Sequence, residues 1–320
     1  MASAVELGLI YAIVALGVYI TFRILDFPDL TVDGSFTTGA GTAAIWIANG
    51  GNPWIGTIVA FFVGSLAGLI TGLLHTKGGI NGLLAGIITM IGLWSINLRI
   101  MQRSNISLLG EDSIFTPLED ARLMGGWISV GILAITVLAI KFILDYFLKT
   151  NVGTALQATG DNEGMIRSFG VNTDNMKILG LMISNALVGL AGAIFAQYNG
   201  SADISMGIGI IVAGLASVIL GQAILGTRSI FFATLGVIVG AILYRLFISW
   251  AMGLGLNVND MKLISAVLVV IALLLPKWNL FKKLNRKRSG GGAVPLEHDP
   301  ASAEGADVSA ASTTEEAVQR

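Results

Sequence analysis

Apolar runs of about 20 residues recur along most of this chain, and they restrict its fold more than any other feature. A helix of that length spans a hydrocarbon core of about 30 Å. The runs occupy residues 6–24, 37–49, 54–74, 82–99, 127–148, 178–199, 206–225, 229–250 and 261–276. We therefore predict an all-α membrane bundle of about eight to ten transmembrane helices within residues 1–276. The second run is short and the seventh is rich in glycine, so either helix could be broken or re-entrant.

The composition agrees with a protein that lies in lipid. Charged residues make up 12% of the chain, whereas an ordinary soluble domain carries about 25%. Gly64, Gly68 and Gly72 recur at four-residue intervals in one apolar run, and such spacing lets helix backbones approach closely. The chain has no cysteine, which excludes disulfides, thiol catalysis and cysteine metal sites.

The distribution of Lys and Arg predicts the orientation, because positively charged loops stay in the cytoplasm. A basic juxtamembrane segment, residues 277–288, follows the last run and contains Lys277, Lys282, Lys283, Arg286, Lys287 and Arg288. This places the C-terminal end in the cytoplasm and, counting back, the N-terminus outside. The polar loop at residues 150–177 is then cytoplasmic. Residues 289–320 have few large apolar side chains, which predicts a disordered cytoplasmic tail.

The loop at residues 150–177 has the signals of a short helix. Asp161 or Asn162 can cap its start, Glu163 suits the first turn, and Gly170 can end it in a left-handed conformation. Its apolar residues, which fall along one edge, are Met165, Ile166 and Phe169. That edge could insert into a groove of a partner protein. The alternative is a helix that lies on its own bundle or on lipid headgroups.

Three blocks of sequence resemble a known family. Gly153-Thr-Ala-Leu-Gln-Ala-Thr-Gly-Asp-Asn and Ile166-Arg-Ser-Phe-Gly-Val-Asn resemble the cytoplasmic coupling loop of ABC importer permeases of the branched-chain amino acid and ribose type. The run from Lys177 to Gln197 resembles the helix that follows this loop in the family. A third block, from Tyr11 through Arg23-Ile-Leu-Asp-Phe-Pro-Asp, resembles the start of a subgroup associated with amino acid uptake, including tryptophan or tyrosine systems.

The resemblance implies a type II-like importer permease of the bacterial cytoplasmic (inner) membrane. Its implied partners are a second permease copy in a homodimer, a cytoplasmic ATPase dimer and an extracytoplasmic solute-binding protein. The chain has no Gly-x-x-x-x-Gly-Lys-Ser/Thr phosphate loop, so we expect it to bind no cofactor and the partner ATPase to use the ATP. The residues expected to couple the permease to the ATPase are Gly160, Asp161, Asn162, Met165, Ile166, Phe169 and Gly170.

Two polar interruptions suggest where the translocation path lies. One runs from Asp26 to Gly39 and the other from Gln197 to Gly207, each just before an apolar run. Irregular backbone survives in a membrane only where protein or water satisfies it, so both should line the interior, and they could belong to an inverted repeat. The candidate path residues are Asp33, Thr37, Asn97, Asn185, Gln197, Asp203 and Ser205. The alternatives are ordinary helix capping at the membrane surface for the acids and helix-to-helix hydrogen bonds for the amides.

Other functions fit the sequence less well. A permease of the same family that carries a sugar or a nucleoside is still an alternative. An ion-coupled secondary transporter or channel should have an ionisable residue deep in a helix, whereas Arg23, Arg99 and Arg245 all fall near predicted span ends. An enzyme is disfavoured because no His-Glu-x-x-His or Gly-x-Ser-x-Gly motif occurs. The basic segment is better explained by orientation and membrane lipid than by a nucleic-acid partner.

Overall fold

The computed structural model describes residues 1–227 and 229–253, together with residues 263, 266, 267, 269 and 270. The helices are α1 (Ala2–Tyr19), the π-helix η1 (Ile20–Ile24), α2 (Thr31–Ala48), α3 (Pro53–Thr76), α4 (Gly82–Met101), α5 (Thr116–Asp120), α6 (Trp127–Leu148), α7 (Asn151–Asp161), α8 (Glu163–Ser168), α9 (Thr173–Asn199), α10 (Ile210–Leu225) and α11 (Ile230–Gly253). Apart from the isolated positions above, the predicted helix at 261–276 lies outside the described residues. The basic segment 277–288 and the tail 289–320 also lie outside them.

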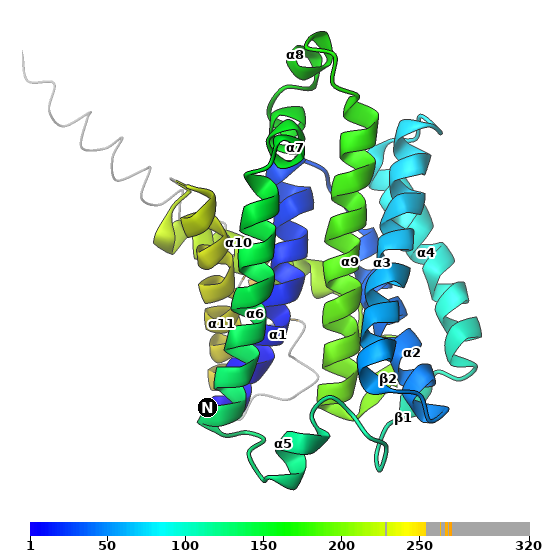
Figure 1. The fold of residues 1–320 in the computed structure, drawn as a ribbon, viewed down its shortest axis with the longest axis vertical. Helices are drawn as coiled ribbons and strands as arrows, with labels where there is room; N and C mark the ends of the chain where they lie inside the picture. The colour runs from blue at the N-terminus through cyan, green and yellow to red at the C-terminus, as the bar shows by residue number, and fades with distance from the viewer. Residues whose placement is uncertain (228, 254–262, 264–265, 268, 271–320) are drawn as a thin grey trace, which may run out of the picture. The chain divides into compact units, whose positions relative to one another are not determined.

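The described helices form the membrane bundle that the sequence predicts. Within the described residues, six helices are long and apolar enough to cross a membrane. Two short strands, β1 (Asn105–Ser107) and β2 (Ser201–Asp203), pair antiparallel, with Ile106 opposite Ala202. Figure 1 shows these strands and α5 at the end of the bundle where the N-terminus lies, and α7 and α8 at the opposite end. The all-α prediction is confirmed, apart from this small two-stranded sheet.

The long helix α9 packs against α2 and α3 through glycines. A Cβ atom added at Gly68 of α3 would lie 2.2 Å from the backbone oxygen of Leu181, and one at Gly39 of α2 would lie 2.0 Å from that of Gly189. Between helices in lipid, van der Waals contact replaces the hydrophobic driving force, so close backbone approach stabilises the bundle. The prediction of close packing at the spaced glycines of α3 is confirmed.

Two helices, α2 and α10, begin inside the bundle rather than at its end. Gly34, in the first turn of α2, packs against Met90 and Leu93, which lie in the middle of α4. Gly34 is therefore near mid-depth, and α2 begins three residues earlier, at residue 31 and not at residue 37. The segments 25–30 and 204–209 lead into these two starts. Both predicted interruptions are present but shorter than expected, because residues 31–39 belong to α2 and residues 197–199 belong to α9.

One charged pair lies deeper than the sequence suggests. The Lys141 side chain in α6 is fully buried and forms an ion pair with Asp145, one turn further along. The Asp145 carboxylate also accepts a hydrogen bond from the Thr234 hydroxyl of α11, 2.7 Å away. The expectation that charges lie near span ends is wrong for Lys141, because Asp145 on the same helix pairs with it and the ring of Phe231 on α11 lies 3.5 Å from its nitrogen. A buried charge is tolerated when it is paired and hydrogen-bonded in this way.

Candidate translocation cavity and coupling loop

The starts of α2 and α10 meet at Asp33. The backbone N–H groups of Gly209 and Ile211 each donate to a carboxylate oxygen of Asp33, at 2.8 Å. A carboxylate at a helix start satisfies free amide groups and interacts favourably with the helix dipole. Asp33 thus caps α10 although it belongs to α2. Ordinary capping of its own helix at the membrane surface, the alternative for the acids, is not what Asp33 does.

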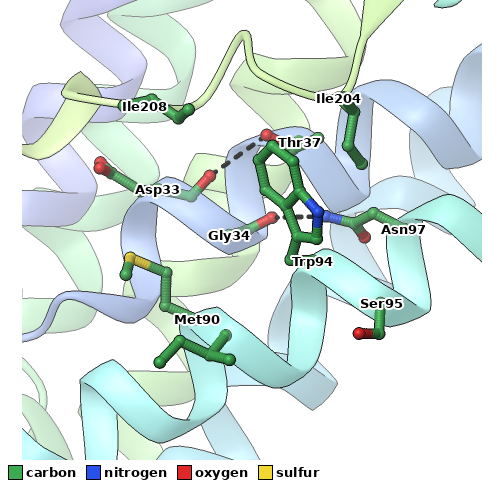
Figure 2. A pocket seen from close by; sticks show the side chains of 10 residues that line it. Asp33, Gly34, Thr37, Met90, Trp94, Ser95, Asn97, Ile204 and Ile208 are labelled. Carbon is green, nitrogen blue, oxygen red and sulfur yellow. Dashed lines mark hydrogen bonds between the residues drawn. The ribbon is translucent and has the colours of Figure 1, made fainter. Parts of the chain in front are cut away.

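A cavity of about 400 Å³ lies beside this junction. Its lining comes from α2, α4 and the segment before α10 and includes Asp33, Thr37, Met90, Ile91, Trp94, Asn97, Ile204 and Ile208. Figure 2 shows these side chains around the cavity. Ile91 is 62% exposed and Trp94 is 42% exposed, so the cavity opens toward the outside of the bundle. The cavity combines a half-buried carboxylate with a mostly apolar wall.

Three of the seven candidate path residues line this cavity: Asp33, Thr37 and Asn97. The Thr37 hydroxyl donates to the backbone oxygen of Asp33 at 3.3 Å, and the Asn97 amide nitrogen donates to that of Gly34 at 3.3 Å. The Asn97 side-chain oxygen is buried without a hydrogen-bond partner among the described residues. The fold brings together residues that are 64 positions apart (97 minus 33).

The amides of α9 connect helices instead of lining the cavity. Asn185 donates to the buried carboxylate of Asp29 at 2.7 Å and accepts from the Ser35 hydroxyl at 2.6 Å. Gln197 donates to the Thr57 hydroxyl at 2.8 Å. Both amides match the alternative interpretation, helix-to-helix hydrogen bonding, since each satisfies its polar atoms across a helix contact.

Asp203 ends β2, Ser205 lies in the turn that follows, and neither residue lines the cavity. The Ser205 backbone N–H donates to the Asp203 carboxylate at 2.8 Å, and the Asn105 side chain donates to it at 3.3 Å. Partial burial raises the pKa of Asp203, but the hydrogen bonds from Ser205 and Asn105 outweigh this and leave that pKa below its usual value. Their contacts hold this turn against β1.

The loop at residues 150–177 contains a helix, α7, that the sequence analysis missed. Thr150 caps it by accepting from the Gly153 N–H at 3.2 Å, and its Leu156 is fully buried. A Cβ atom at Gly160 would lie only 1.8 Å from the backbone oxygen of Ile24, where η1 ends. The recurrence of Gly153, Leu156 and Gly160 at spacings of three and four was the available signal. This part of the loop packs directly on the transmembrane bundle.

The short capped helix predicted in the same loop is present as α8. The Asn162 side chain, not that of Asp161, accepts from the Met165 N–H at 3.0 Å, and Gly170 follows with φ of +84°. The Met165 residue is 48% exposed and Phe169, directly after α8, is 75% exposed. Ile166 is partly buried. The apolar edge of α8 is therefore left uncovered by the bundle at Met165 and Phe169.

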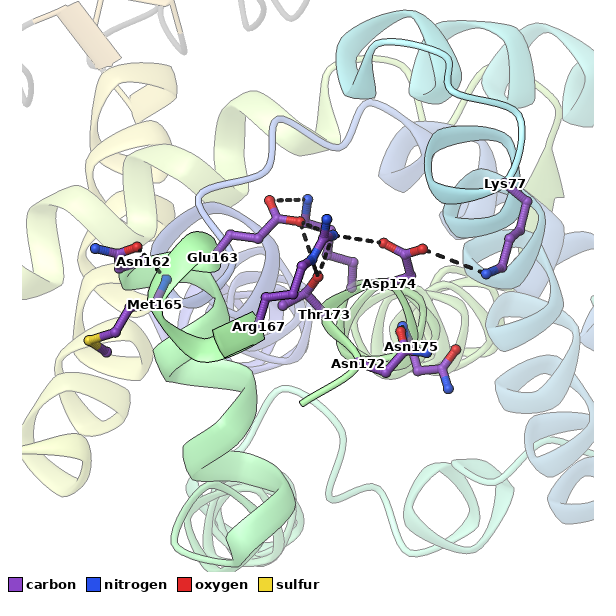
Figure 3. Close-up of polar contacts among 10 residues, drawn as sticks. Lys77, Asn162, Glu163, Met165, Arg167, Asn172, Thr173, Asp174 and Asn175 are labelled. Carbon is purple, nitrogen blue, oxygen red and sulfur yellow. Dashed lines mark hydrogen bonds and ion pairs between the residues drawn. The ribbon is translucent and has the colours of Figure 1, made fainter. Parts of the chain in front are cut away.

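A cluster of charged residues holds α8 to the start of α9 (Figure 3). Glu163 pairs with Lys177 at 2.7 Å and with Arg167 at 2.9 Å, and Arg167 also reaches Asp174 at 3.4 Å. The hydrogen bond from Lys177 holds the pKa of Glu163 below its usual value. A carboxyl group whose pKa is lowered on folding stabilises the folded loop at pH values above its ordinary pKa of about 4.3. This stabilisation is lost as the pH falls through the pKa that Glu163 has in the folded protein. The cluster is therefore intact near neutral pH.

Comparison with known proteins identifies the family. Residues 1–274 match the family described as branched-chain amino acid transport system / permease component. The chain belongs to this family. This permease is 44% identical over 287 residues to a tyrosine transport system permease protein of Clostridioides difficile (strain R20291), which covers 89% of this chain and 94% of that protein. It is 25% identical over 258 residues to a ribose import permease protein of Escherichia coli (strain K12), and the match covers 77% of this chain and 76% of that protein.

A solved structure shows the same fold. An inward-facing ABC transporter of the metal-chelate type superposes with a TM-score of 0.50 and 15% identity, covering 87% of this chain and 84% of that one. At this identity the likeness concerns the fold alone. The family and the apolar helices make this permease an integral membrane protein and a transport subunit rather than an enzyme. As an ABC permease it implies a partner ATPase.

Proposed function

We propose that this chain is the membrane-spanning subunit of an ATP-driven importer that carries an amino acid across the bacterial cytoplasmic membrane. Two copies enclose the path, an ATPase dimer binds on the cytoplasmic side, and an extracytoplasmic binding protein delivers the solute. Residues 150–177 and the C-terminal end lie in the cytoplasm. The chain itself binds no nucleotide, because it has no phosphate-binding loop.

The observation that carries this proposal is the exposed apolar edge of α8. Met165 and Phe169 project from a short helix that the bundle does not cover. Large apolar side chains gathered at one exposed place favour a protein partner over water. The charged cluster fixes α8 on α9, and Gly160 fixes the adjoining α7 on the end of η1. A partner that moves α8 would therefore move α7 and the transmembrane helices with it.

The amino acid cargo is supported by the relatives. The tyrosine transport permease shares 44% identity over nearly all of both chains, whereas the ribose permease shares 25% over about three quarters. Higher identity over a longer span favours amino acid over sugar. The residues proposed to couple to the ATPase are Gly160, Asp161, Asn162, Met165, Ile166, Phe169 and Gly170.

The position of Asp33 supports a path on the open side of the cavity. A half-buried carboxylate at mid-depth is costly against lipid, and such groups face a bundle interior or a water-filled cavity. The open side of the cavity is lined by exposed Ile91 and Trp94. A second copy of the permease placed against this face would separate Asp33 from lipid and enclose the cavity as a path.

Transport by the reconstituted complex tests the function. The permease is purified with its ATPase, placed in liposomes and supplied with the binding protein and labelled tyrosine, leucine or ribose. We expect uptake that needs ATP and that is far greater for tyrosine than for ribose. Uptake driven by an ion gradient without ATP would contradict the importer assignment, and uptake of ribose alone would contradict the amino acid cargo.

Water access to the cavity tests where the path lies. The chain has no cysteine, so one introduced thiol can be followed by itself. We expect Ile91→Cys to react with a membrane-impermeant maleimide, because only a thiol in contact with water forms the reactive thiolate. Ile135→Cys, on α6, is the matched control: Ile135 is 70% exposed but should face lipid and stay unlabelled. Equal labelling of the two variants would contradict the proposal that the path lies at this cavity.

A further inference from the structure

We propose that a second cavity, at the α7 end of the bundle, binds a free α-amino acid, and that this ligand inhibits transport by joining α7 to the transmembrane helices. This regulation rests on the proposed function, because it requires that α7 and α8 face the cytoplasm and couple to the ATPase. The second cavity shares no lining residue with the cavity beside Asp33.

The second cavity has a polar wall and the size of a small ligand. Its volume is about 310 Å³, at the lower end of the range of about 300–1,000 Å³ that is typical of ligand sites. It lies where η1, α7, the end of α10 and the start of α11 meet. The polar and charged side chains that line it include Arg23, Gln157, Asp161, Gln222, Thr227 and Ser229.

The transmembrane elements contribute hydrogen-bond donors without partners. The amide nitrogen of Gln222, on α10, is buried and has no hydrogen-bond partner in the described part of the chain. The guanidinium group of Arg23, on η1, forms no hydrogen bond or ion pair with any residue that the structure describes. A buried donor without a partner costs free energy, so Gln222 indicates that a ligand or water occupies this cavity.

The helix α7 contributes acceptors to the same cavity. Gln157 donates through its amide nitrogen to the backbone oxygens of Leu148 at 2.8 Å and Gly153 at 3.1 Å, which leaves its side-chain oxygen available. Asp161 follows one turn later, and its carboxylate accepts no hydrogen bond from the described residues. Arg23 and Asp161 line one cavity but do not pair with each other, so both charges are available to a ligand.

These four groups match the two charges of an α-amino acid. A carboxylate fits the planar fork of a guanidinium group and also accepts from an amide, so it suits Arg23 and Gln222. An ammonium group has three donors and no acceptor, so it suits Asp161 and Gln157. A simple anion would be repelled by Asp161, and a simple amine would leave the donors of Arg23 and Gln222 unmatched. The ligand class is therefore a small zwitterion.

A ligand in this position would restrain the loop at residues 150–177. It would contact α7 on one hand and η1 and α10 on the other, and so stabilise the arrangement in which these elements lie this close together. A ligand that prefers one conformation shifts the population toward it. A transport cycle passes through several conformations, so stabilising one of them slows the cycle. Amino acid that accumulates in the cytoplasm would thereby reduce its own uptake.

The test measures ATP hydrolysis by the permease and ATPase in liposomes that enclose the binding protein and tyrosine. ATP is added outside, so only complexes whose ATPase faces outward are active, and leucine added outside reaches their cytoplasmic face. Leucine is a suitable probe because the site recognises the ammonium and carboxylate groups rather than the side chain. Isoamylamine, which lacks the carboxylate, and isocaproate, which lacks the ammonium group, are the matched compounds. We expect leucine to inhibit hydrolysis and both analogues to be at least about tenfold weaker.

We expect Gln222→Leu and Arg23→Gln each to raise the half-inhibitory concentration of leucine about tenfold, without changing the uninhibited rate. Gln222→Leu should not lower the Tm, because it removes a buried donor that has no partner. Arg103→Gln is the matched control, because Arg103 is exposed between α4 and β1 and does not line the second cavity. It should be inhibited like the unmodified complex.

The outcomes separate this inference from the proposed function. Absence of inhibition by leucine, or equal inhibition of the unmodified complex and both cavity variants, overturns the regulatory site. Inhibition by isocaproate at the same concentration as leucine overturns the assignment of a zwitterion. In each case a complex that still responds to the binding protein and transports its cargo leaves the proposed function intact. A complex whose ATP hydrolysis does not respond to the binding protein contradicts the proposed function itself.

Discussion

Replacing Met165 and Phe169 together by aspartate should detach the ATPase from this permease and abolish uptake. Both side chains are exposed on α8 and should insert into a groove of the partner. Central apolar residues of an interface each contribute about 2 kcal/mol or more, or about 30-fold in affinity. Two buried aspartates would add a desolvation cost. The measurement is co-purification of the ATPase with the permease from detergent-solubilised membranes.

Leu109→Asp is the matched control for this experiment. Leu109 is 85% exposed, and it lies beside β1, at the end of the bundle opposite α8. The substitution introduces one aspartate, where the double variant has two, at an apolar position more exposed than Met165 or Phe169, and it should leave co-purification of the ATPase unchanged. Retention of the ATPase and of uptake by the double variant would refute the role proposed for α8. Loss of the ATPase in Leu109→Asp as well would show that the charge acts through expression or folding.

Gly160→Ala should uncouple the loop from the transmembrane bundle. The added Cβ atom would lie 1.8 Å from the backbone oxygen of Ile24, so α7 or the end of η1 must shift. Overpacking of this kind typically costs about 1–3 kcal/mol. We expect a lower thermal stability and a large loss of uptake, while the ATPase still binds, because Met165 and Phe169 are unchanged. The measurements are the Tm, ATPase co-purification and the amount of cargo transported per ATP hydrolysed.

Gly164→Ala separates packing from helix propensity. Gly160 and Gly164 both lie inside helices, so alanine should favour the helix at both positions by about 0.5–1 kcal/mol. A Cβ atom at Gly164 would have only the Asn162 side-chain oxygen within 4 Å, at 3.6 Å. Gly164→Ala should therefore preserve both stability and coupling. If Gly160→Ala also preserves stability and transport, the contact with Ile24 does not couple the loop to the transmembrane bundle.

In the loop at residues 150–177, the sequence predicted one helix and missed another. The short helix α8 was predictable because its signals are local: Asn162 caps it, Gly170 follows it, and Met165 and Phe169 share an edge. The helix α7 was missed although Leu156 and Gly160 are correctly spaced. Its stability comes from packing on Ile24 and α9, and no local pattern shows such a contact.

For the cavity, sequence reasoning found residues but not their arrangement. Asp33, Thr37 and Asn97 were chosen because they are polar in an apolar chain, and they line one cavity. Asn185 and Gln197 were chosen for the same reason, yet they bond to other helices. A polar side chain in lipid needs a partner in either case, so its presence cannot tell a path residue from a helix contact.

The sequence by itself determined that this is a membrane bundle whose polar loop contains a short capped helix, because spans of about 20 apolar residues and local caps are short-range patterns. It also predicted the two interruptions before α2 and α10. Only the tertiary structure decided that these interruptions meet, with Asp33 of α2 capping α10 at mid-depth beside Trp94. The reason is physical: amide groups exposed inside a membrane must find acceptors, and the fold supplied one from 176 residues away in the chain.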